Sequence, residues 1–592
     1  MPTPSRLPHK PEPVLPPGRP YAALPLLWAA VVLILTLTPA NEMPHTPNWE
    51  LLSFDTAAHA GVFVVLAGLS WFSVKRQRRW PRLARHAGLV VFVGSTLFGG
   101  LIEVLQMTMR LGRHGDWTDL LSDAIGAGLT VGLATAWTTR QQPRTRPLAS
   151  IIWFGVVLAG AGPTLAHAQD MLRARRTIEK LTSPALHGRG YVQQGEHNAA
   201  AYLRSRLRDL KLEPLAPNYT QSFTLNVNTF PGKVKMTLVE PAPAIRATVL
   251  TPGTDFIVLP DAKSINATEL WVSRLDTVDL ATNETQLTWL KTLRQHPASG
   301  RAVLSTARVQ TKYPSLPPYL RQAIDSSAVH LELVPKLIAS LSSEQANQTK
   351  IAVLENAKYW TAGGGTLKLQ LQIEADLKRN YQTQNLAALI RGTAQPDSFL
   401  VVSAHYDHLG MMGKNVYFPG ANDNASGVAL LLELAAHYAL PKNRLAYSIV
   451  FLLFGAEEAG LVGSSHFVAH PLIPLKSIKF LVNLDLLGTG EQGATVVNGR
   501  VLEAPYRRLV TLNEAHHYLP QLAPRGRAAN SDHAPFFEAG VPAFFIYTRG
   551  GSTAYHDVND RPEALSLAGF AGAFGLVRDF IGELGAAPTP KK

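Results

Sequence analysis

The sequence predicts a multidomain protein. An N-terminal all-α transmembrane bundle of about five spans is followed by an α/β domain with a mostly parallel central sheet, and a β-rich insert interrupts that domain. Long apolar runs fill the first 168 of the 592 residues, β-branched runs with prolines fill the middle, and apolar strands alternate with helices towards the C-terminus. The chain contains no cysteine, which excludes disulfides, thiolate metal ligands and thiol nucleophiles.

Five apolar stretches near the N-terminus have about the length that spans a bilayer. They cover residues 21–40, 57–74, 87–109, 120–139 and 148–168. Lys and Arg concentrate in alternate connectors, and the net charge of +13 fits membrane flanks better than a nucleic-acid surface. With residues 1–20 as a cytoplasmic tail, everything after Ala168 lies outside the bacterial inner membrane. The alternative is a set of buried helices in a soluble protein.

Ionisable side chains inside membrane spans are costly and usually face a bundle interior or a water-filled cavity. The candidates for an intramembrane polar site are Asp55, His59, Glu103, Gln106, Asp119 and Asp123. The surrounding segments "DTAAHA", "GLIEVLQ" and "RHGDWTDLLSDAIGAGLT" resemble the VanZ-like family of small membrane proteins, over roughly residues 21–140. We therefore predict a four-span VanZ-like domain at residues 21–147. Its polar residues form either a small-molecule or lipid-headgroup site, or contacts between helices.

The fifth stretch, residues 148–168, has two possible identities. Arg140, Arg144 and Arg146 precede it, and it ends in "LAHAQD", as a signal peptide with an A-x-A cleavage site would. If it stays intact, it anchors the downstream domain in the membrane. Cleavage after Ala168 would instead release that domain.

The α/β domain is predicted in two pieces, residues 169–228 and 380–592. Residues 170–212 show helical spacing of apolar side chains, and Phe223–Asn226 indicates the edge of a strand. Buried strands are predicted at Phe399–Ala404, Ala446–Phe454, Ile478–Asp485 and Pro542–Tyr547, with helices at Gly427–Leu440 and Leu461–Ala469. This alternation predicts a mostly parallel sheet.

Residues 229–379 lie between the two pieces and follow a different pattern. Short β-branched runs, prolines and turns predict a β-rich inserted domain. The insert holds no cluster of His, Asp and Glu that would form a site. Its expected work is to restrict access to the site or contact substrate, and a purely structural lid is equally compatible with the sequence.

Polar side chains follow each predicted strand of the α/β domain. They are His405, Asp407, Asp423, Glu457, Glu458, Asp485, His556 and Asp560. In an open α/β sheet the carboxyl ends of the strands meet at one crevice, so these residues converge. Imidazoles and carboxylates without sulfur favour a zinc-type site, and the excess of carboxylates suggests two metal ions that share a bridging carboxylate.

Six ordered motifs carry a second resemblance. They are "AHYDHLG" (404–410), "NDNASG" (422–427), "AEEAGLVGS" (456–464), "NLDLLG" (483–488), "NSDHAPF" (530–536) and "YHDVND" (555–560). Together they resemble metallopeptidase family 28, the co-catalytic zinc aminopeptidases, over residues 170–223 and 381–583. The insert then lies where that family often carries a protease-associated domain, although no sharp signature of that domain is present.

The resemblance implies two Zn²⁺ per chain and assigns their ligands. His405 and Asp485 would hold one ion, Glu458 and His556 would hold the other, and Asp423 would bridge both.

The same resemblance implies the remaining roles. Glu457 would be the general base that takes a proton from a metal-bound water and returns it to the leaving amine. Asp407 would orient His405, and Asp560 is the candidate for the same task at His556.

The expected function is therefore a membrane-anchored zinc aminopeptidase that hydrolyses N-terminal residues of peptides on the outer side of the bacterial inner membrane. Its partners would be peptide substrates and the lipid bilayer, with no nucleic acid. One alternative is a glutaminyl-cyclase-like enzyme with a single zinc ion. Another is a catalytically dead peptide-binding domain that serves a VanZ-like membrane function.

Overall fold

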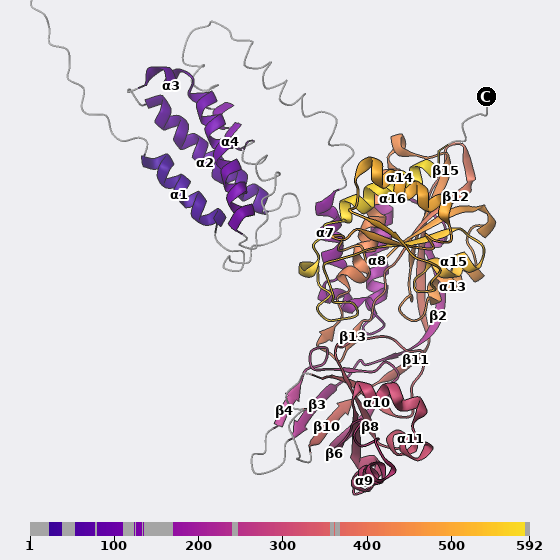
Figure 1. The fold of residues 1–592 in the computed structure, drawn as a ribbon. Helices are drawn as coiled ribbons and strands as arrows, with labels where there is room; N and C mark the ends of the chain where they lie inside the picture. The colour runs from indigo at the N-terminus through magenta and orange to yellow at the C-terminus, as the bar shows by residue number, and fades with distance from the viewer. Residues whose placement is uncertain are drawn as a thin grey trace, which may run out of the picture. The chain divides into compact units, whose positions relative to one another are not determined.

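The computed structural model describes residues 23–37, 54–76, 80–109, 124, 126–128, 130–132, 134, 170–239, 247–355, 360 and 367–586. The chain divides into two compact units, residues 1–163 and 164–592. Figure 1 shows the chain as a ribbon, coloured from indigo at the N-terminus to yellow at the C-terminus.

The N-terminal unit is helical over its described residues. Its main helices are α1 (Ala23–Leu37), α2 (Phe54–Arg76), α3 (Pro81–Arg85) and α4 (Ala87–Met109). Val32, Phe63 and Ile102 form a small shared core, whereas Leu89 and Leu97 on α4 are more than half exposed. Among the described residues, no helix meets the length and hydropathy expected of a membrane span.

The predicted intramembrane polar site falls outside what the structure describes. Asp55 and His59 belong to α2, and Glu103 and Gln106 belong to α4, but the structure does not describe their side chains. Asp119, Asp123 and the predicted span at residues 148–168 lie outside the described residues altogether.

A nine-stranded sheet organises the α/β domain of the second unit, and it confirms the predicted α/β class. Its order is β1-β11-β15-β12-β16-β19-β17-β18, and β2 also pairs with β11. The central pairs β12–β15, β12–β16 and β16–β19 are parallel. The strands are β1 (Glu213–Pro214), β2 (Thr220–Thr229), β11 (Asp376–Ile390), β12 (Gln395–His405), β15 (Tyr447–Phe454), β16 (Ile478–Leu484), β17 (Ala494–Val497), β18 (Leu522–Pro524) and β19 (Ala543–Thr548).

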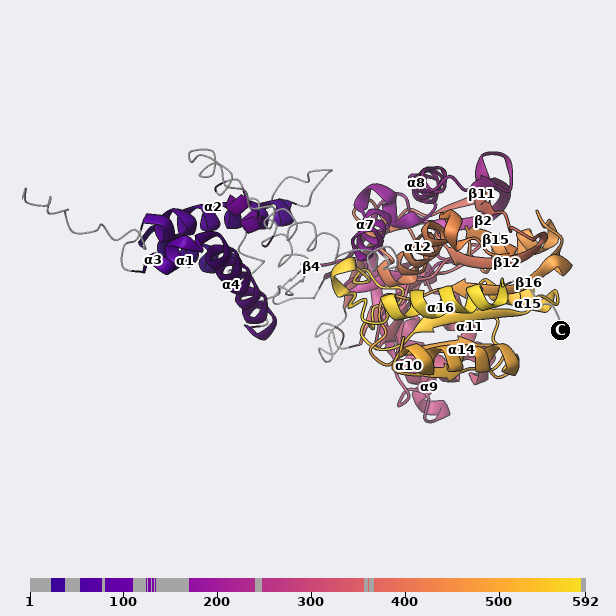
Figure 2. The same cartoon turned by 90° about the horizontal axis from the view of Figure 1, so that it is seen from above.

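Helices cover both faces of this sheet (Figure 2). Alternate residues of β12 supply the two cores: Leu400 and Val402 pack in the larger one, and Phe399 and Val401 pack in the other. The larger core takes in α7 (Met171–Leu181), α8 (Gly195–Asp209), α12 (Gly427–Ala439), α14 (Glu503–His516) and α16 (Phe570–Leu584). The other core takes in α13 (Val462–Ala469) and α15 (His533–Glu538). Burial on both faces explains why these strands read as continuous apolar runs.

The helical pattern predicted over residues 170–212 is interrupted. A 3₁₀ segment at Pro184–Arg189 separates α7 from α8. Within it Gly188 has a φ of +63°, and a Cβ there would lie 2.4 Å from the carbonyl oxygen of Gly410. Only glycine permits that backbone conformation together with such a close approach. The turn therefore brings the N-terminal segment against the loop that follows β12.

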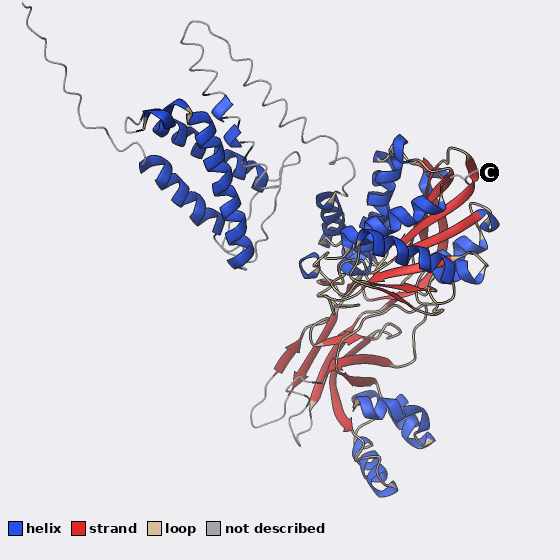
Figure 3. Ribbon diagram, turned by 45° about the horizontal axis from the view of Figure 1, so that its top comes forward, coloured by secondary structure: helices blue, strands red, loops and turns tan. Residues whose placement is uncertain are grey.

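The insert forms an eight-stranded sheet in the order β4-β3-β10-β6-β7-β8-β9-β5. Its strands are β3 (Val234–Val239), β4 (Ala247–Leu250), β5 (Phe256–Val258), β6 (Ile265–Leu275), β7 (Arg301–Ser305), β8 (Val329–Val334), β9 (Thr349–Leu354) and β10 (Lys368–Ile373). Figure 3 shows helices beside this sheet as well, and they are α9 (Asn283–Leu293), α10 (Ala307–Lys312) and α11 (Pro318–Asp325). Leu409, Met412 and Phe418, which follow β12, pack into the core of the insert.

His330 should make the insert sensitive to acid. Its side chain is buried, and its Nε2 lies 2.7 Å from Ser305 Oγ. Burial, with a smaller effect of Lys350, lowers the pKa of His330 to about 4. The pKa of a histidine in the unfolded chain is about 6.5. As the pH falls from 6.5 towards the pKa of buried His330, mainly the unfolded state gains the proton. The free energy of unfolding should therefore fall by on the order of 2–3 kcal/mol between pH 7 and pH 4.

Urea unfolding of the full chain at these two pH values, followed by tryptophan fluorescence, measures this change. The His330→Gln variant should lose that part of the pH dependence. An identical pH dependence in the parent and the variant would contradict the prediction.

Candidate active site

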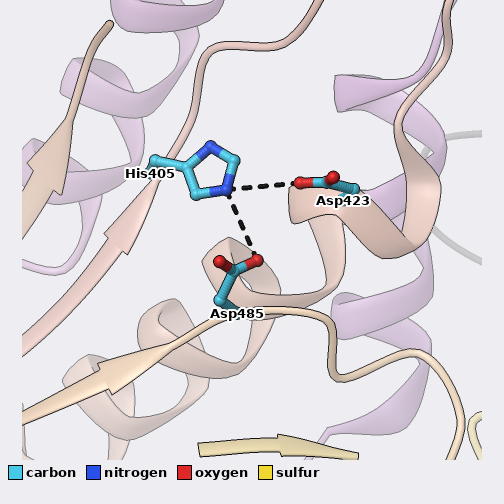
Figure 4. Close-up of side chains that lie close together, drawn as sticks. All are labelled: His405, Asp423 and Asp485. Atoms are coloured by element: carbon cyan, nitrogen blue, oxygen red, sulfur yellow. Dashed lines mark ion pairs between the residues drawn. The ribbon is translucent and has the colours of Figure 1, made fainter. Parts of the chain in front are cut away.

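The side chains predicted to converge do so at the carboxyl end of the sheet. His405 is the last residue of β12, and Asp485 directly follows β16. Asp423 lies in the short helical segment Ala421–Ser426 that leads into α12. These three side chains point toward one another (Figure 4). A cavity of about 270 Å³ opens there, and its polar lining includes His405, Asp423, Glu457, Glu458, Asp485 and His556.

Asp423 lies between two histidines and offers a different oxygen to each. Its Oδ1 is 3.3 Å from His405 Nε2, and its Oδ2 is 3.2 Å from His556 Nε2. Asp485 Oδ1 lies 3.4 Å from His405 Nε2, and Glu458 Oε2 lies 3.0 Å from His556 Nε2. The five side chains thus form two half-sites that share one carboxylate.

Hydrogen bonds fix which nitrogen of each histidine faces the cavity. His405 Nδ1 lies 3.3 Å from the carbonyl oxygen of Asp407, and His556 Nδ1 lies 2.8 Å from the carbonyl oxygen of Ala339. A carbonyl oxygen can only accept a hydrogen bond, so both Nδ1 atoms carry the proton. In the neutral rings the lone pairs of Nε2 therefore point at the carboxylates, as metal ligation requires.

The two half-sites fit zinc. Two nitrogen or oxygen ligands that surround a tetrahedral zinc ion at about 2.0–2.1 Å lie about 3.3–3.4 Å apart, and the observed separations run from 3.0 to 3.4 Å. In addition, Asp485 Oδ1 is buried, and it accepts no hydrogen bond from the residues that the structure describes. A cation beside this oxygen would satisfy it.

An excess of negative charge dominates the electrostatics of the cluster. Burial lowers the pKa of His556, but hydrogen bonds to Asp423 and Glu458 outweigh it and raise that pKa to about 11. The pKa of His405 is likewise raised well above its usual range, because Glu457 and Asp485 outweigh its burial. Protons on both imidazoles offset carboxylate charge here, and metal cations could take their place.

Glu457 differs from the carboxylates that face a histidine. Its burial raises its pKa well above the ordinary range, and the negative charges of Asp532 and Glu458 act in the same direction although His405 opposes them. By contrast, hydrogen bonds from His408 and His556 outweigh the burial of Glu458 and lower its pKa to about 2. The pKa values of two adjacent glutamates are thus shifted in opposite directions.

Asp407 supports the glutamate pair as well as His405. Its Oδ1 lies 3.7 Å from His405 Nδ1, and the same carboxylate accepts hydrogen bonds from the backbone N–H groups of Glu457 (3.1 Å) and Glu458 (3.3 Å). Tyr191 Oη lies 3.5 Å from its other oxygen. One buried carboxylate therefore links the end of β12 to the loop after β15.

The contacts correct the expected role of Asp560. Its carboxylate accepts hydrogen bonds from the backbone N–H groups of Asn422 (2.9 Å) and Asp423 (3.0 Å), so it holds the loop of the shared carboxylate and does not hold His556. The motif "YHDVND" indicated that Asp560 lies near the site but could not indicate its partner. His556 instead bonds to Ala339 of the insert.

Arg189 is a supporting residue that sequence reasoning missed. It is fully buried, and it donates hydrogen bonds to the carbonyl oxygens of Leu181, Tyr406, Pro419, Gly420 and Asp423. Burial lowers its pKa to about 10 even though nearby carboxylates raise it. The signal in the sequence was an arginine between two glycines at residues 188–190, but nothing in that pattern connects it to the site.

His408 is a second residue that was missed, although it lies inside the motif "AHYDHLG". Its ring is fully buried, and its Nδ1 donates a hydrogen bond of 2.6 Å to Glu458 Oε1. The other oxygen of Glu458 faces His556. His408 thus fixes the carboxylate of Glu458 so that Oε2 points into the cavity.

A polar chain holds Asp485. Ser531 Oγ donates to Asp485 Oδ2 (2.9 Å), and Asn483 Nδ2 donates to Ser531 Oγ (2.8 Å). Asn483 Oδ1 in turn accepts from Ser403 on β12. The side chain therefore has a fixed orientation that leaves Oδ1 facing His405.

Fold and site together define a class, an α/β domain with a candidate metal site at the carboxyl ends of its parallel strands. Comparison with known proteins narrows the class. Residues 385–581 match the model of Peptidase family M28, and residues 23–138 match the model of VanZ/LLP1.

Two similar proteins are aminopeptidases by name. "Aminopeptidase YwaD" of Bacillus subtilis (strain 168) is 33% identical over 214 residues, which is 33% of this chain and 45% of that protein. "Aminopeptidase" of Pseudomonas aeruginosa (strain UCBPP-PA14) is 33% identical over 210 residues, which is 33% of this chain and 36% of that protein. The matched region spans less than half the length of these two relatives. These matches support a peptide hydrolase in the part of the chain that carries the site.

A solved structure shows the same fold. BSAP, a zinc aminopeptidase from Bacillus subtilis, aligns with 70% of this chain and 96% of its own, with a TM-score of 0.51 and 22% sequence identity.

Arg189→Met should destabilise the catalytic domain. The variant removes the donor that five buried carbonyl oxygens share, and of these Gly420 keeps a second donor in the N–H of Ala425. We expect a loss of about 3 kcal/mol or more in the free energy of unfolding. Arg206→Met is the matched control, because Arg206 forms a surface ion pair with the exposed Asp209 and should contribute less than about 1 kcal/mol. Urea unfolding measures both, and equal effects would contradict the prediction.

His408 should be replaceable by asparagine but not by phenylalanine. In His408→Asn the new side-chain amide can reach the position of Nδ1 and donate to Glu458, whereas the ring in His408→Phe fills the space without a donor. Loss of such a support typically weakens metal affinity by about 10–100-fold. Zinc titration against a chromophoric chelator should show this loss in His408→Phe only. Equal affinities in the two variants would contradict the prediction.

Proposed function

We propose that the chain is a zinc-dependent aminopeptidase that uses two Zn²⁺ ions. The observation that carries the proposal is the position of Asp423, whose two oxygens face the imidazoles of His405 and His556 at 3.3 and 3.2 Å. One carboxylate between two such half-sites is the arrangement that a pair of metal ions needs. The similarity to proteins named aminopeptidase supports the reaction type.

His405 and Asp485 would hold one ion, Glu458 and His556 the other, and Asp423 both. When bound, the ions would supply a water that loses its proton near neutral pH and would polarise the scissile carbonyl. Glu457 lines the cavity beside these ligands and takes that proton. The protonated carboxyl can then pass the proton to the leaving amine.

The cavity also favours a peptide with a free N-terminus. The carboxylate excess that raises the pKa of His405 and His556 attracts a cationic α-amine equally well. Leu486, Phe545, Tyr547 and Tyr555 supply an apolar wall for a side chain of the substrate. An N-terminal residue with an apolar side chain is therefore the substrate end that this lining suits.

For the N-terminal unit we propose a VanZ-like membrane domain that anchors the peptidase at the outer face of the bacterial inner membrane. The match of residues 23–138 to VanZ/LLP1, the alternation of basic connectors and the exposed leucines of α4 support it. Cleavage after Ala168 would convert the anchored form into a released one. Protease protection of the catalytic domain in right-side-out membrane vesicles tests the placement, and a protected domain would contradict it.

Glu457→Gln should abolish hydrolysis while it leaves metal binding intact. The amide cannot accept the proton of the attacking water, so kcat on aminoacyl chromogenic substrates should fall by about 10²–10⁴-fold. Glu503→Gln, at an exposed position on α14, is the matched control and should keep the parent rate. Zinc is counted in all three proteins.

The proposal is supported if the full-length chain binds about two zinc ions and only Glu457→Gln loses hydrolysis. One zinc ion together with cyclisation of N-terminal Gln peptides would point to a glutaminyl-cyclase-like enzyme instead. A folded chain that takes up no zinc and hydrolyses no substrate would leave a peptide-binding domain.

A further inference from the structure

The loop that carries His556 touches the insert at the point where metal ligation would need support. His556 Nδ1 donates to the carbonyl oxygen of Ala339 at 2.8 Å, and the N–H of Ala339 donates back to the carbonyl oxygen of His556 at 3.1 Å. His556 has a φ of +54°, a conformation that residues with a Cβ seldom adopt. The reciprocal pair of hydrogen bonds holds both the ring and this backbone.

Ala339 is itself firmly placed in the insert. It follows β8, it is buried, and it belongs to the core of the insert together with Leu337. Nearby, Lys336 Nζ donates to the carbonyl oxygens of Thr553 (2.5 Å) and Tyr555 (3.5 Å). The segment Lys336–Ala339 thus holds both His556 and the residues that precede it, and we refer to it as the insert clamp.

A second contact reinforces the same loop. Val558 packs against the core of the insert, and Gly253 lies so close that a Cβ there would be 2.6 Å from Val558 Cγ1. Asp560, two residues further on, accepts hydrogen bonds from the backbone N–H groups of Asn422 and Asp423. Among the described residues, Ala339 is the hydrogen-bond partner of His556 Nδ1.

The two half-sites differ in this respect. His405 takes its Nδ1 support from Asp407 of the catalytic domain itself, whereas His556 takes it from the insert. The partner of the second nitrogen fixes the tautomer and orientation of a ligating histidine and so affects the affinity for the metal.

We propose that the insert is a structural part of the metal site, and that its clamp sets the zinc affinity of the half-site formed by Glu458 and His556. The half-site of His405 and Asp485 does not depend on the clamp. This inference rests on the proposed zinc function, and it gives the insert a task beyond access and substrate contact. Any ligand or contact that shifts the clamp would change the occupancy of one metal position and leave the other unchanged.

The test titrates zinc into the metal-stripped full-length chain in competition with a chromophoric chelator. Lys336→Met removes the bonds to Thr553 and Tyr555, and Ala339→Pro removes the N–H that bonds to His556. Lys263→Met, an exposed lysine elsewhere in the insert, and Ala339→Gly, which keeps both backbone groups, are the matched controls. Circular dichroism verifies that each variant folds.

We expect the parent and both controls to bind two zinc ions, and the two clamp variants to hold one of them about 10–100-fold more weakly. Cobalt substitution should show an altered visible spectrum for one ion only. Parent affinities at both positions in Lys336→Met would overturn the inference, as would an equal weakening of both positions. If Ala339→Pro does not fold, Lys336→Met decides. A parent chain that binds no zinc would overturn the proposed function itself.

Discussion

The site depends on the placement of one carboxylate, that of Asp423, between two imidazoles that come from different strand ends. The backbone around it is held from two directions. Asp560 accepts hydrogen bonds from the N–H groups of Asn422 and Asp423, and Arg189 donates to the carbonyl oxygens of Gly420 and Asp423. An anion and a cation thus fix the donors and the acceptors of the same short loop, which leaves the side chain of Asp423 free to face the histidines.

This arrangement also moderates an electrostatic difficulty. Several buried carboxylates lie close together. Burial, with the repulsion of neighbouring carboxylates, raises the pKa of Glu457 well above its ordinary range and that of Asp532 to about 7. Arg189 is a buried cation close to these carboxylates, but its hydrogen bonds go to backbone carbonyl oxygens and not to the carboxylates. The negative charge therefore stays available to cations in the cavity, and the protein stabilises the loops without neutralising the site.

The sequence predicted the convergence of the site residues for a clear physical reason. Apolar runs buried on both faces identify parallel strands, and such strands place the residues that follow them at one edge. The same reasoning located β12, β15, β16 and β19 to within a few residues. It could not identify Arg189 or Ala339. Arg189 donates to backbone carbonyl oxygens and Ala339 supplies one to His556, and every residue carries such a carbonyl group. It also predicted one helical stretch where the structure has α7 and α8, because apolar spacing alone does not show that the chain turns where Gly188 approaches Gly410. The ligand roles themselves stay predictions.

The attachment of the insert explains how it can influence the site at all. β2 and β11, which flank the insert in the chain, pair with each other, and β11 continues into the catalytic sheet beside β15. These two paired strands attach the insert to the catalytic sheet, but β15, β12 and β16 lie between β11 and β19 in that sheet. The core that Leu409, Met412 and Phe418 share with the insert supplies a second attachment, next to His405 and His408. The bonds from Ala339 and Lys336 to the loop after β19 supply a third. A domain held at three separate places cannot rotate about any one of them without breaking another, so its position and the position of His556 are fixed together.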